Sequence, residues 1–394
     1  MFRRSRFPAF AVLATCALAV SACAPGSNTS GPRKPVANSA PSGTFDPTQP
    51  VTLALLAPST SDNAGAAQLG QALGNAARMS AVALNDPLVN LRIYDTGGRP
   101  ETARAAVTQA LADGAKLIMG PLFSTSTKAV AAPATKQGVK VVSFSTDSNI
   151  AGGPVYLSGF LPEMEARRIT SFARSQGYNQ IGIFYPTNPA GELALRGARS
   201  GAGQALTVQT GFERTESGIV GGAADFAKRV KASGVRAIFV PESGQALAFI
   251  LSQLRSNGLG DGYKFLGHGQ WNTRATLNAK GAAGGWFPAP DPAAMKSFVS
   301  RYRASYGSVP PPLAVLGYDA VQIAGQMLAE ARLTGSRDAF GSASITRPQG
   351  YSGAVGPIRF GPDGLGERGL SVLQVGTSVF ETIDAAPVAF GLGS

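Results

Sequence analysis

Residues 120–149 read GPLFSTSTKAVAAPATKQGVKVVSFSTDSN, and they place two clusters of hydroxyl side chains directly behind two hydrophobic runs. The first run is AKLIM at 115–119 and the second is VKVV at 139–142, with a helix predicted over 126–137 between them. Short apolar strands that alternate with helices indicate a parallel sheet covered on both faces. The carboxyl ends of neighbouring parallel strands meet at one edge, so we expect the two hydroxyl clusters to lie together.

The same alternation extends outward from this stretch in both directions. It begins with a buried-strand pattern, VTLALLA at 51–57, and continues to a strand predicted at 264–267, with a break at 152–154. Two helical segments follow, and residues 351–383 then show short β segments separated by Gly and Asp turns. Two sets of alternating strands and helices predict an α/β protein with two doubly wound parallel-sheet lobes.

The amino end carries the pattern of an export signal. Arg3, Arg4 and Arg6 precede an apolar run over 10–20, and small residues then lead to Cys23. This order is typical of a secretory signal peptide, and the apolar run is too short for a permanent membrane helix. The cysteine makes the segment similar to a bacterial lipoprotein signal, which implies removal of residues 1–22 and lipidation of Cys23. The alternatives are an ordinary signal peptide with a bystander cysteine, or a short anchor.

Composition restricts the class of protein further. Residues 23–50 are rich in Pro, Ser, Asn, Thr and Gly, which predicts a flexible tether. The chain's two cysteines, Cys16 and Cys23, both lie in the signal region, so the mature domain is expected to have neither a disulfide nor a thiolate site. The net charge of +12 is spread along the chain. Scattered basic residues indicate a solvated surface, and an exported protein is not expected to bind nucleic acid.

The sequence offers little for catalysis. His268 is the one histidine, and without a second histidine or a thiol the usual zinc sites are excluded. We find no Gly-x-Ser-x-Gly, no Ser-x-x-Lys and no phosphate-binding glycine loop. Glu163 and Glu165 are two residues apart, so they do not share one face of a helix. We therefore predict no catalytic residue, metal or cofactor, and a secreted hydrolase is the weaker alternative.

The hydroxyl clusters fit a binding site instead. In an open parallel sheet the ligand crevice lies outside the carboxyl ends of the strands. Hydroxyls and backbone N–H groups at a helix N-terminus there can hold an anionic group. The structural alternative is that Ser124, Ser126 or Thr127 caps the helix that follows. One cap uses one hydroxyl, and the clusters contain more than capping needs.

The order of elements, together with the stretch at 120–149, GYDAVQIAGQML at 317–328 and GYSGAVGPIRFGPDG at 350–364, resembles a type I periplasmic binding protein of the leucine/isoleucine/valine receptor group. The resemblance covers about 51–383. It implies two lobes hinged around a cleft that closes on a small ligand. It also implies that the ligand's carboxylate contacts hydroxyl residues of the first lobe. The ligand-binding residues predicted in this way are Phe123, Ser124, Ser145, Thr146 and Asp147.

Two positions depart from the receptor pattern. Ala190 stands where the family usually has an aromatic residue, and the loop after 264–267 reads HGQWNT, without the acid that would hold an ammonium group. The lipoprotein signal, the long polar tether and VVSFSTDSN at 141–149 are similar to those of lipoproteins that act as penicillin-binding protein activators. Two functions therefore stay open: a solute receptor of an ABC-type importer for an amino acid or other small carboxylate, and an activator that binds a peptidoglycan synthase. The partners would be an ABC permease or that synthase.

The resemblance also implies a division of the chain and a location. We expect a periplasmic protein that is anchored by its lipid to the inner or outer membrane. The expected parts are a signal peptide at 1–22, a tether at 23–50, lobe 1 at 51–158 plus 286–347, and lobe 2 at 159–285 plus 348–385.

Overall fold

The computed structural model describes residues 45–391 of the chain. The predicted signal peptide, Cys23 and the tether up to residue 44 lie outside the described residues. The last part of the predicted tether, 45–50, is folded: Phe45 is 6% exposed in the first hydrophobic core, and its N–H donates to the carbonyl of Arg337 (3.1 Å). The tether prediction was therefore too long at this end, because one aromatic side chain is enough to dock the segment.

The first sheet has five parallel strands in the order β2-β1-β3-β4-β5. Alternate residues of β1 point to opposite faces, as the period of a strand requires. Leu53 and Leu55 pack with α1 and α10, whereas Ala54 and Leu56 pack with α2 and α3. The elements are β1 (Val51–Ala57), α1 (Ala64–Leu84), β2 (Val89–Asp95), α2 (Pro100–Ala112), β3 (Ala115–Met119), α3 (Ser124–Lys136), β4 (Lys140–Ser143), η1 (Ser148–Ile150), β5 (Val155–Leu157) and α10 (Val315–Thr334).

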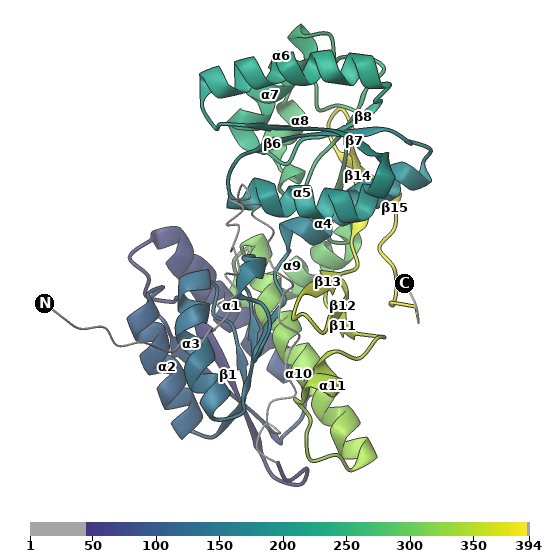
Figure 1. The fold of residues 1–394 in the computed structure, drawn as a ribbon. Helices are drawn as coiled ribbons and strands as arrows, with labels where there is room; N and C mark the ends of the chain where they lie inside the picture. The colour runs from purple at the N-terminus through teal and green to yellow at the C-terminus, as the bar shows by residue number, and fades with distance from the viewer. Residues whose placement is uncertain (1–44, 392–394) are drawn as a thin grey trace, which may run out of the picture. The chain divides into compact units, whose positions relative to one another are not determined.

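The second sheet has seven strands in the order β15-β14-β10-β9-β8-β6-β7 (Figure 1). Strands β6 to β10 are parallel, and β14 runs antiparallel to both β10 and β15. Helices α4 and α5 share one core with the sheet, and α6 and α7 share the other. The elements are α4 (Pro162–Ser175), β6 (Ile181–Pro186), α5 (Pro189–Ala202), η2 (Gly203–Ala205), β7 (Leu206–Phe212), α6 (Glu216–Ser233), β8 (Ala237–Phe239), α7 (Gly244–Ser256), β9 (Lys264–Leu266), η3 (Gly269–Trp271), α8 (Arg274–Asn278), β10 (Trp286–Ala289), β14 (Ser371–Val375) and β15 (Phe380–Asp384).

A third, antiparallel sheet packs with the first lobe. Its order is β11-β12-β13, and Tyr351, Ile358 and Phe360 from its strands join the core that contains β1 and α10. The remaining elements are α9 (Pro292–Tyr306), η4 (Pro312–Ala314), α11 (Ser342–Ile345), β11 (Tyr351–Gly353), β12 (Gly356–Phe360) and β13 (Gly366–Arg368).

The fold class predicted from the sequence is confirmed: the protein is α/β, with two lobes built on parallel sheets. Two of the predicted lobe boundaries were wrong. β10 belongs to the second sheet, although 286–347 was expected in lobe 1, and β11 to β13 pack with the first core, although 348–385 was expected in lobe 2. Short β segments show which residues form strands but not which core they cover. We propose that the first lobe comprises 45–157 and 292–368, and the second 162–289 and 371–384.

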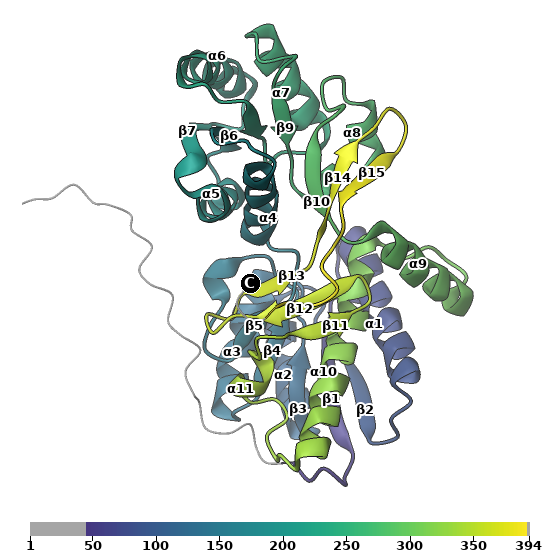
Figure 2. The same cartoon turned by 90° about the vertical axis from the view of Figure 1, so that its right-hand side faces the viewer.

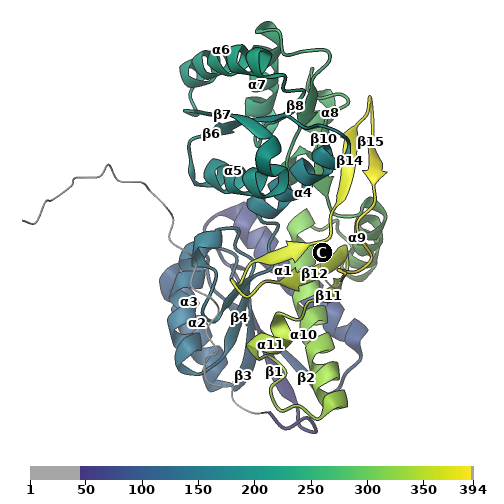
Figure 3. The same cartoon turned by 45° about the vertical axis from the view of Figure 1, so that its right-hand side comes forward.

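The chain therefore crosses between the lobes three times, between β5 and α4, between β10 and α9, and between β13 and β14 (Figures 2 and 3). A buried ion pair lies beside the third crossing. Arg368 Nη1 is 2.7 Å from Asp319 Oδ2, and Arg368 Nε donates to the carbonyl of Ser158 at the first crossing (2.8 Å). Neither charged side chain is more than 5% exposed. This pair joins α10 to two of the three crossings.

Candidate ligand-binding site

Four loops meet at the carboxyl edge of the first sheet, and we call them the first strand-end face. They follow β1, β2, β3 and β4. The chain leaves β1 toward β2 but leaves β3 toward β4, so the topological switch point lies between β1 and β3. Ligands of open α/β sheets bind at such a point. The first strand-end face consists of residues 58–63, 96–99, 120–123 and 144–147.

Three of these loops approach one another closely at Gly98. Its φ of +75° is in the left-handed region, and a Cβ there would lie 2.9 Å from Ser61 Oγ and 3.2 Å from Phe123 Cε2. Such distances leave no room for a side chain, so Gly98 lets the loops after β1 and β3 approach each other. Ser61 and Phe123 therefore flank the switch point.

Two of the hydroxyls hold the loops after β3 and β4 together. The Ser143 hydroxyl donates to the carbonyl of Pro121 (3.0 Å), accepts from the Ser145 N–H (3.1 Å) and lies 2.8 Å from the Thr127 hydroxyl. The Thr127 hydroxyl also lies 3.0 Å from the carbonyl of Phe123. These buried hydrogen bonds fix the geometry of the face, so Ser143 and Thr127 are structural.

The capping alternative for the first hydroxyl cluster was wrong. Helix α3 begins at Ser124 with Phe123 as its N-cap, and Phe123 makes no side-chain capping bond. Ser124, Ser126 and Thr127 thus lie inside the helix, and Ser126 is fully buried. The N–H groups of the first turn have no side-chain cap, and no acidic residue lies there. Such a helix end favours an anion.

The predicted site residues lie on this face or, for Ser124, directly beside it at the start of α3. Phe123 and Ser124 are half-buried at the start of α3, Ser145 is buried at 3% exposure, and Thr146 is exposed in the loop after β4. The Ser145 hydroxyl accepts from the Asp147 N–H (3.2 Å), and Asp147 Oδ1 accepts from the N–H and the side-chain amide of Asn149 (3.1 and 3.0 Å). That they contact a ligand stays a prediction.

The loops after β6, β8 and β9 form the second strand-end face, residues 187–188, 240–243 and 267–271. A carboxyl–imidazole pair is buried beneath it. Glu165 Oε2, from the first turns of α4, accepts from the Gly269 N–H (3.1 Å) and lies 4.0 Å from His268 Nδ1. Burial raises the pKa of the Glu165 carboxyl to about 7, although the Gly269 hydrogen bond lowers it. Burial also lowers the pKa of the His268 imidazole to about 4.

Two further pairs arrange this second face. Arg214 Nε and Nη2 bind both oxygens of the buried Glu242 carboxylate (2.9 and 3.1 Å), and the Glu242 carbonyl accepts from Trp271 Nε1 (2.8 Å). The Ser243 hydroxyl donates to Gln270 Oε1 (3.0 Å). Glu242 is therefore neutralised by an arginine, and the exposed Gln270 presents an uncharged amide.

A side-chain contact links the second lobe to the edge of the first. Arg196 on α5 donates from Nη2 to the Ser148 hydroxyl (3.3 Å), one residue after Asp147. The middle of α5 therefore lies beside η1, directly after the first strand-end face.

A family model described as periplasmic binding protein matches residues 50–379. The chain belongs to the periplasmic binding protein family. The match spans all three crossings and every strand except β15, so it covers both lobes.

Solved structures show the same type I fold. A putative branched-chain amino acid ABC transporter protein of Rhodospirillum rubrum is 20% identical with a TM-score of 0.71, over 85% of this chain and 100% of that one. A solute binding protein of Rhodopseudomonas palustris in complex with 3,4-dihydroxybenzoic acid is 20% identical with a TM-score of 0.56, over 85% and 96%. A leucine binding protein of Thermotoga maritima is 19% identical with a TM-score of 0.56, over 87% and 99%. Comparison with curated protein sequences finds no match.

Sequence reasoning missed several residues of this periplasmic binding protein's faces. Glu165 was set aside because it shares no helix face with its neighbour, yet it brings a carboxyl to the loop after β9, where the sequence showed none. Ser61 was missed although the hydroxyl-rich stretch at 58–63 follows β1 in the same way as the two clusters that were recognised. The Ser61 signal was therefore available in the sequence, whereas the Glu165 contact joins residues 104 apart.

Among residues 45–391, no three His, Cys, Asp or Glu side chains are grouped so that they could hold a metal ion. Within the same range, no helix is both long and apolar enough to cross a bilayer.

Proposed function

We propose that this periplasmic binding protein is the solute receptor of an ABC-type importer and binds a small carboxylate, such as an amino acid or an aromatic acid, between its two strand-end faces. It acts without catalysis, in the periplasm, anchored through lipid on Cys23. The single observation that carries the proposal is the uncapped start of α3 beside the hydroxyl loop of β4, at the switch point of the first sheet.

The ligand's carboxylate would bind at the first strand-end face. Ser124, Ser145 and Thr146 stand at the positive end of α3, where N–H groups and hydroxyls both donate to an anion. Phe123 would cover the apolar part of the ligand, and Asp147 would accept from a donor group next to the carboxylate. The second face would then add its uncharged groups, Gln270 and Ser243, when the lobes close.

The transport assignment rests on the similar proteins. Those of Rhodospirillum rubrum and Rhodopseudomonas palustris are described as belonging to ABC transporters, and the ligands named are leucine for one relative and 3,4-dihydroxybenzoic acid for another. No specific observation favours the peptidoglycan-synthase activator, which becomes an outcome of the test.

A thermal-shift screen tests the proposal. A ligand that binds only the folded state stabilises it by RT ln(1 + [L]/Kd), which is about 2.7 kcal/mol at 100 times Kd. The panel contains the proteinogenic amino acids, benzoate, 3,4-dihydroxybenzoate and muropeptides. We expect at least one amino acid or aromatic acid to raise Tm. If no member of the panel raises Tm and a peptidoglycan synthase co-purifies with the protein, the receptor proposal is wrong.

A further inference from the structure

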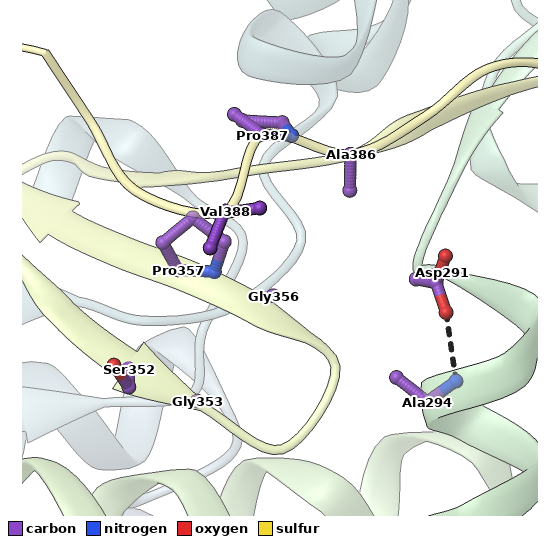
Figure 4. Close-up of a pocket in the computed structure, with 9 residues that line it drawn as sticks. All are labelled: Asp291, Ala294, Ser352, Gly353, Gly356, Pro357, Ala386, Pro387 and Val388. Atoms are coloured by element: carbon purple, nitrogen blue, oxygen red, sulfur yellow. Dashed lines mark hydrogen bonds between the residues drawn. The ribbon is translucent and has the colours of Figure 1, made fainter.

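The chain's last described segment returns from the second sheet to the small sheet of the first lobe. After β15, the Ala386 N–H donates to the Ser371 hydroxyl (3.0 Å). Figure 4 shows Pro387 and Val388 beside Pro357 of β12. A Cβ on Gly369 would lie 2.8 Å from Pro357 and 2.9 Å from Pro387, so all three meet at the third crossing. We call residues 385–390 the tail strap.

The end of the tail strap is held on β12. Phe390 is 9% exposed, and the guanidinium of Arg359 lies 4.4 Å from the centre of its ring. A cation over an aromatic face is attracted by the ring's quadrupole. Phe390 therefore anchors the tail strap to the first lobe.

The carboxylate of Glu367 connects Arg359 to the second lobe. Arg359 Nε and Nη2 lie 2.9 and 2.8 Å from Glu367 Oε2 on β13, and Arg167 of α4 pairs with Glu367 Oε1. Helix α4 packs with the second sheet. Glu367 therefore holds one arginine from each lobe, and one of the two also holds Phe390.

The beginning of the tail strap is tied to α4 as well. Asp384, the last residue of β15, pairs with Arg168, whose Nε donates to the carbonyl of Leu370 at the third crossing (3.0 Å). Arg168 of α4 thus pairs with Asp384, just before the tail strap. The adjacent Arg167 pairs with Glu367, the partner of Arg359.

Room for movement exists beside the tail strap. A pocket of about 360 Å³ is bounded by Ala386, Pro387 and Val388 on one side and by the β11–β12 hairpin and the start of α9 on the others (Figure 4). The ion pairs are also partly exposed, with Arg167 at 34% and Glu367 at 26%. Exposed pairs are weak and reversible, so the contacts can form and break while the protein stays folded.

We propose that the tail strap and the Arg167–Glu367–Arg359 bridge form a non-covalent latch that limits how far the two lobes swing apart. The three covalent crossings allow rotation, and the latch adds a fourth connection that joins the second lobe to the first. This inference takes from the proposed function only that the lobes move. It does not require any particular ligand.

Distance measurement between two nitroxide labels tests the latch without a ligand. The full chain, with Cys16 and Cys23 replaced by Ser, carries labels at Lys128→Cys on α3 and Glu192→Cys on α5, both exposed positions. We expect Phe390→Ala and Glu367→Gln each to broaden the distance distribution and move it to longer distances. Val388→Ser, at a position 97% exposed, is the matched control and should leave the distribution unchanged.

The outcomes separate the latch from the receptor function. If Phe390→Ala and Glu367→Gln both keep the parent's distribution while circular dichroism shows them folded, the latch does not exist. Should one variant fail to fold, the other decides. A ligand screen that finds no binder would overturn the proposed function and leave the latch result standing.

Discussion

The buried pair Glu165–His268 predicts an unusual dependence of stability on pH, which single substitutions would reveal. The two side chains are only 10% and 14% exposed, and burial shifts their pKa values in opposite directions. The perturbations are Glu165→Gln and His268→Gln, which remove one titrating group each and keep a polar side chain. The quantity of interest is the free energy of unfolding between pH 4 and pH 7.5.

The sign follows from which state binds protons more tightly. The pKa of Glu165 rises from 4.5 to about 7 on folding, so the folded state keeps the proton and stability falls as pH rises through this interval. The pKa of His268 falls from 6.5 to about 4, so the unfolded state takes up the proton first and stability rises with pH. One pKa unit corresponds to about 1.36 kcal/mol, so each group contributes about 3 kcal/mol over its interval.

In the parent protein these two slopes cancel between about pH 4.5 and 6.5. In His268→Gln the Glu165 slope stands alone, and the variant should lose about 3 kcal/mol relative to the parent as pH rises from 4 to 6.5. In Glu165→Gln the His268 slope stands alone, so this variant becomes more stable as pH rises from 4 to 6.5.

Subtracting the parent removes the falling Glu165 contribution, so the stability of Glu165→Gln relative to the parent rises by about 3 kcal/mol from pH 4.5 to 7. The two variants therefore diverge: with increasing pH, His268→Gln loses stability relative to the parent and Glu165→Gln gains it.

Urea unfolding at half-unit pH steps measures these differences, and taking each variant against the parent removes the titration of all other groups. Glu192→Gln, at an exposed position on α5, makes the same chemical change as Glu165→Gln and should show no such trend. Parallel pH profiles for the parent and both buried-pair variants would refute the reasoning, because they would mean that folding shifts neither pKa.

Three further predictions concern packing, the buried ion pair and the site. Gly197→Ala on α5 would place a Cβ 2.0 Å from a backbone oxygen of α4 and should lower stability by about 1–3 kcal/mol. Gly221→Ala on α6, where a Cβ would meet nothing within 4 Å, should not lower stability. Thermal unfolding of the two variants measures the difference. Asp319→Ala leaves a buried arginine unpaired and should cost about 3–5 kcal/mol in urea unfolding; a cost below about 1 kcal/mol would contradict this. Ser124→Ala should weaken binding of the ligand found by thermal shift by about 2- to 10-fold in calorimetry, and the fully buried Ser126→Ala should not; equal effects would argue against the proposed site.

Most of the fold could be predicted from the sequence because the spacing of apolar residues depends directly on the local secondary structure. The strand pattern at 51–57 is β1 to the residue, and the helix predicted over 126–137 is α3, Ser124–Lys136. The lobe boundaries failed at β10 and at 351–368, since apolar strand patterns do not reveal the sheet in which a strand pairs. Phe45 was placed in the tether for a related reason, because its partners lie far along the chain.

The candidate site was predictable only in part. The two hydroxyl clusters identified the first strand-end face, because strand ends in a parallel sheet converge. Which hydroxyls serve the structure could not be read from spacing: Thr127 and Ser143 belong to different clusters and bind each other across 16 residues. The pair Glu165–His268 was also out of reach, because its members lie on separate elements and their pKa values depend on burial.

The central claim is that a small carboxylate binds between the two strand-end faces and draws the lobes together. The most direct test is the distance between labels at Lys128→Cys and Glu192→Cys, measured with and without leucine or 3,4-dihydroxybenzoate, whichever raises Tm. We predict a shorter and narrower distance distribution when the ligand is bound. An unchanged distribution at a saturating ligand concentration would contradict the claim.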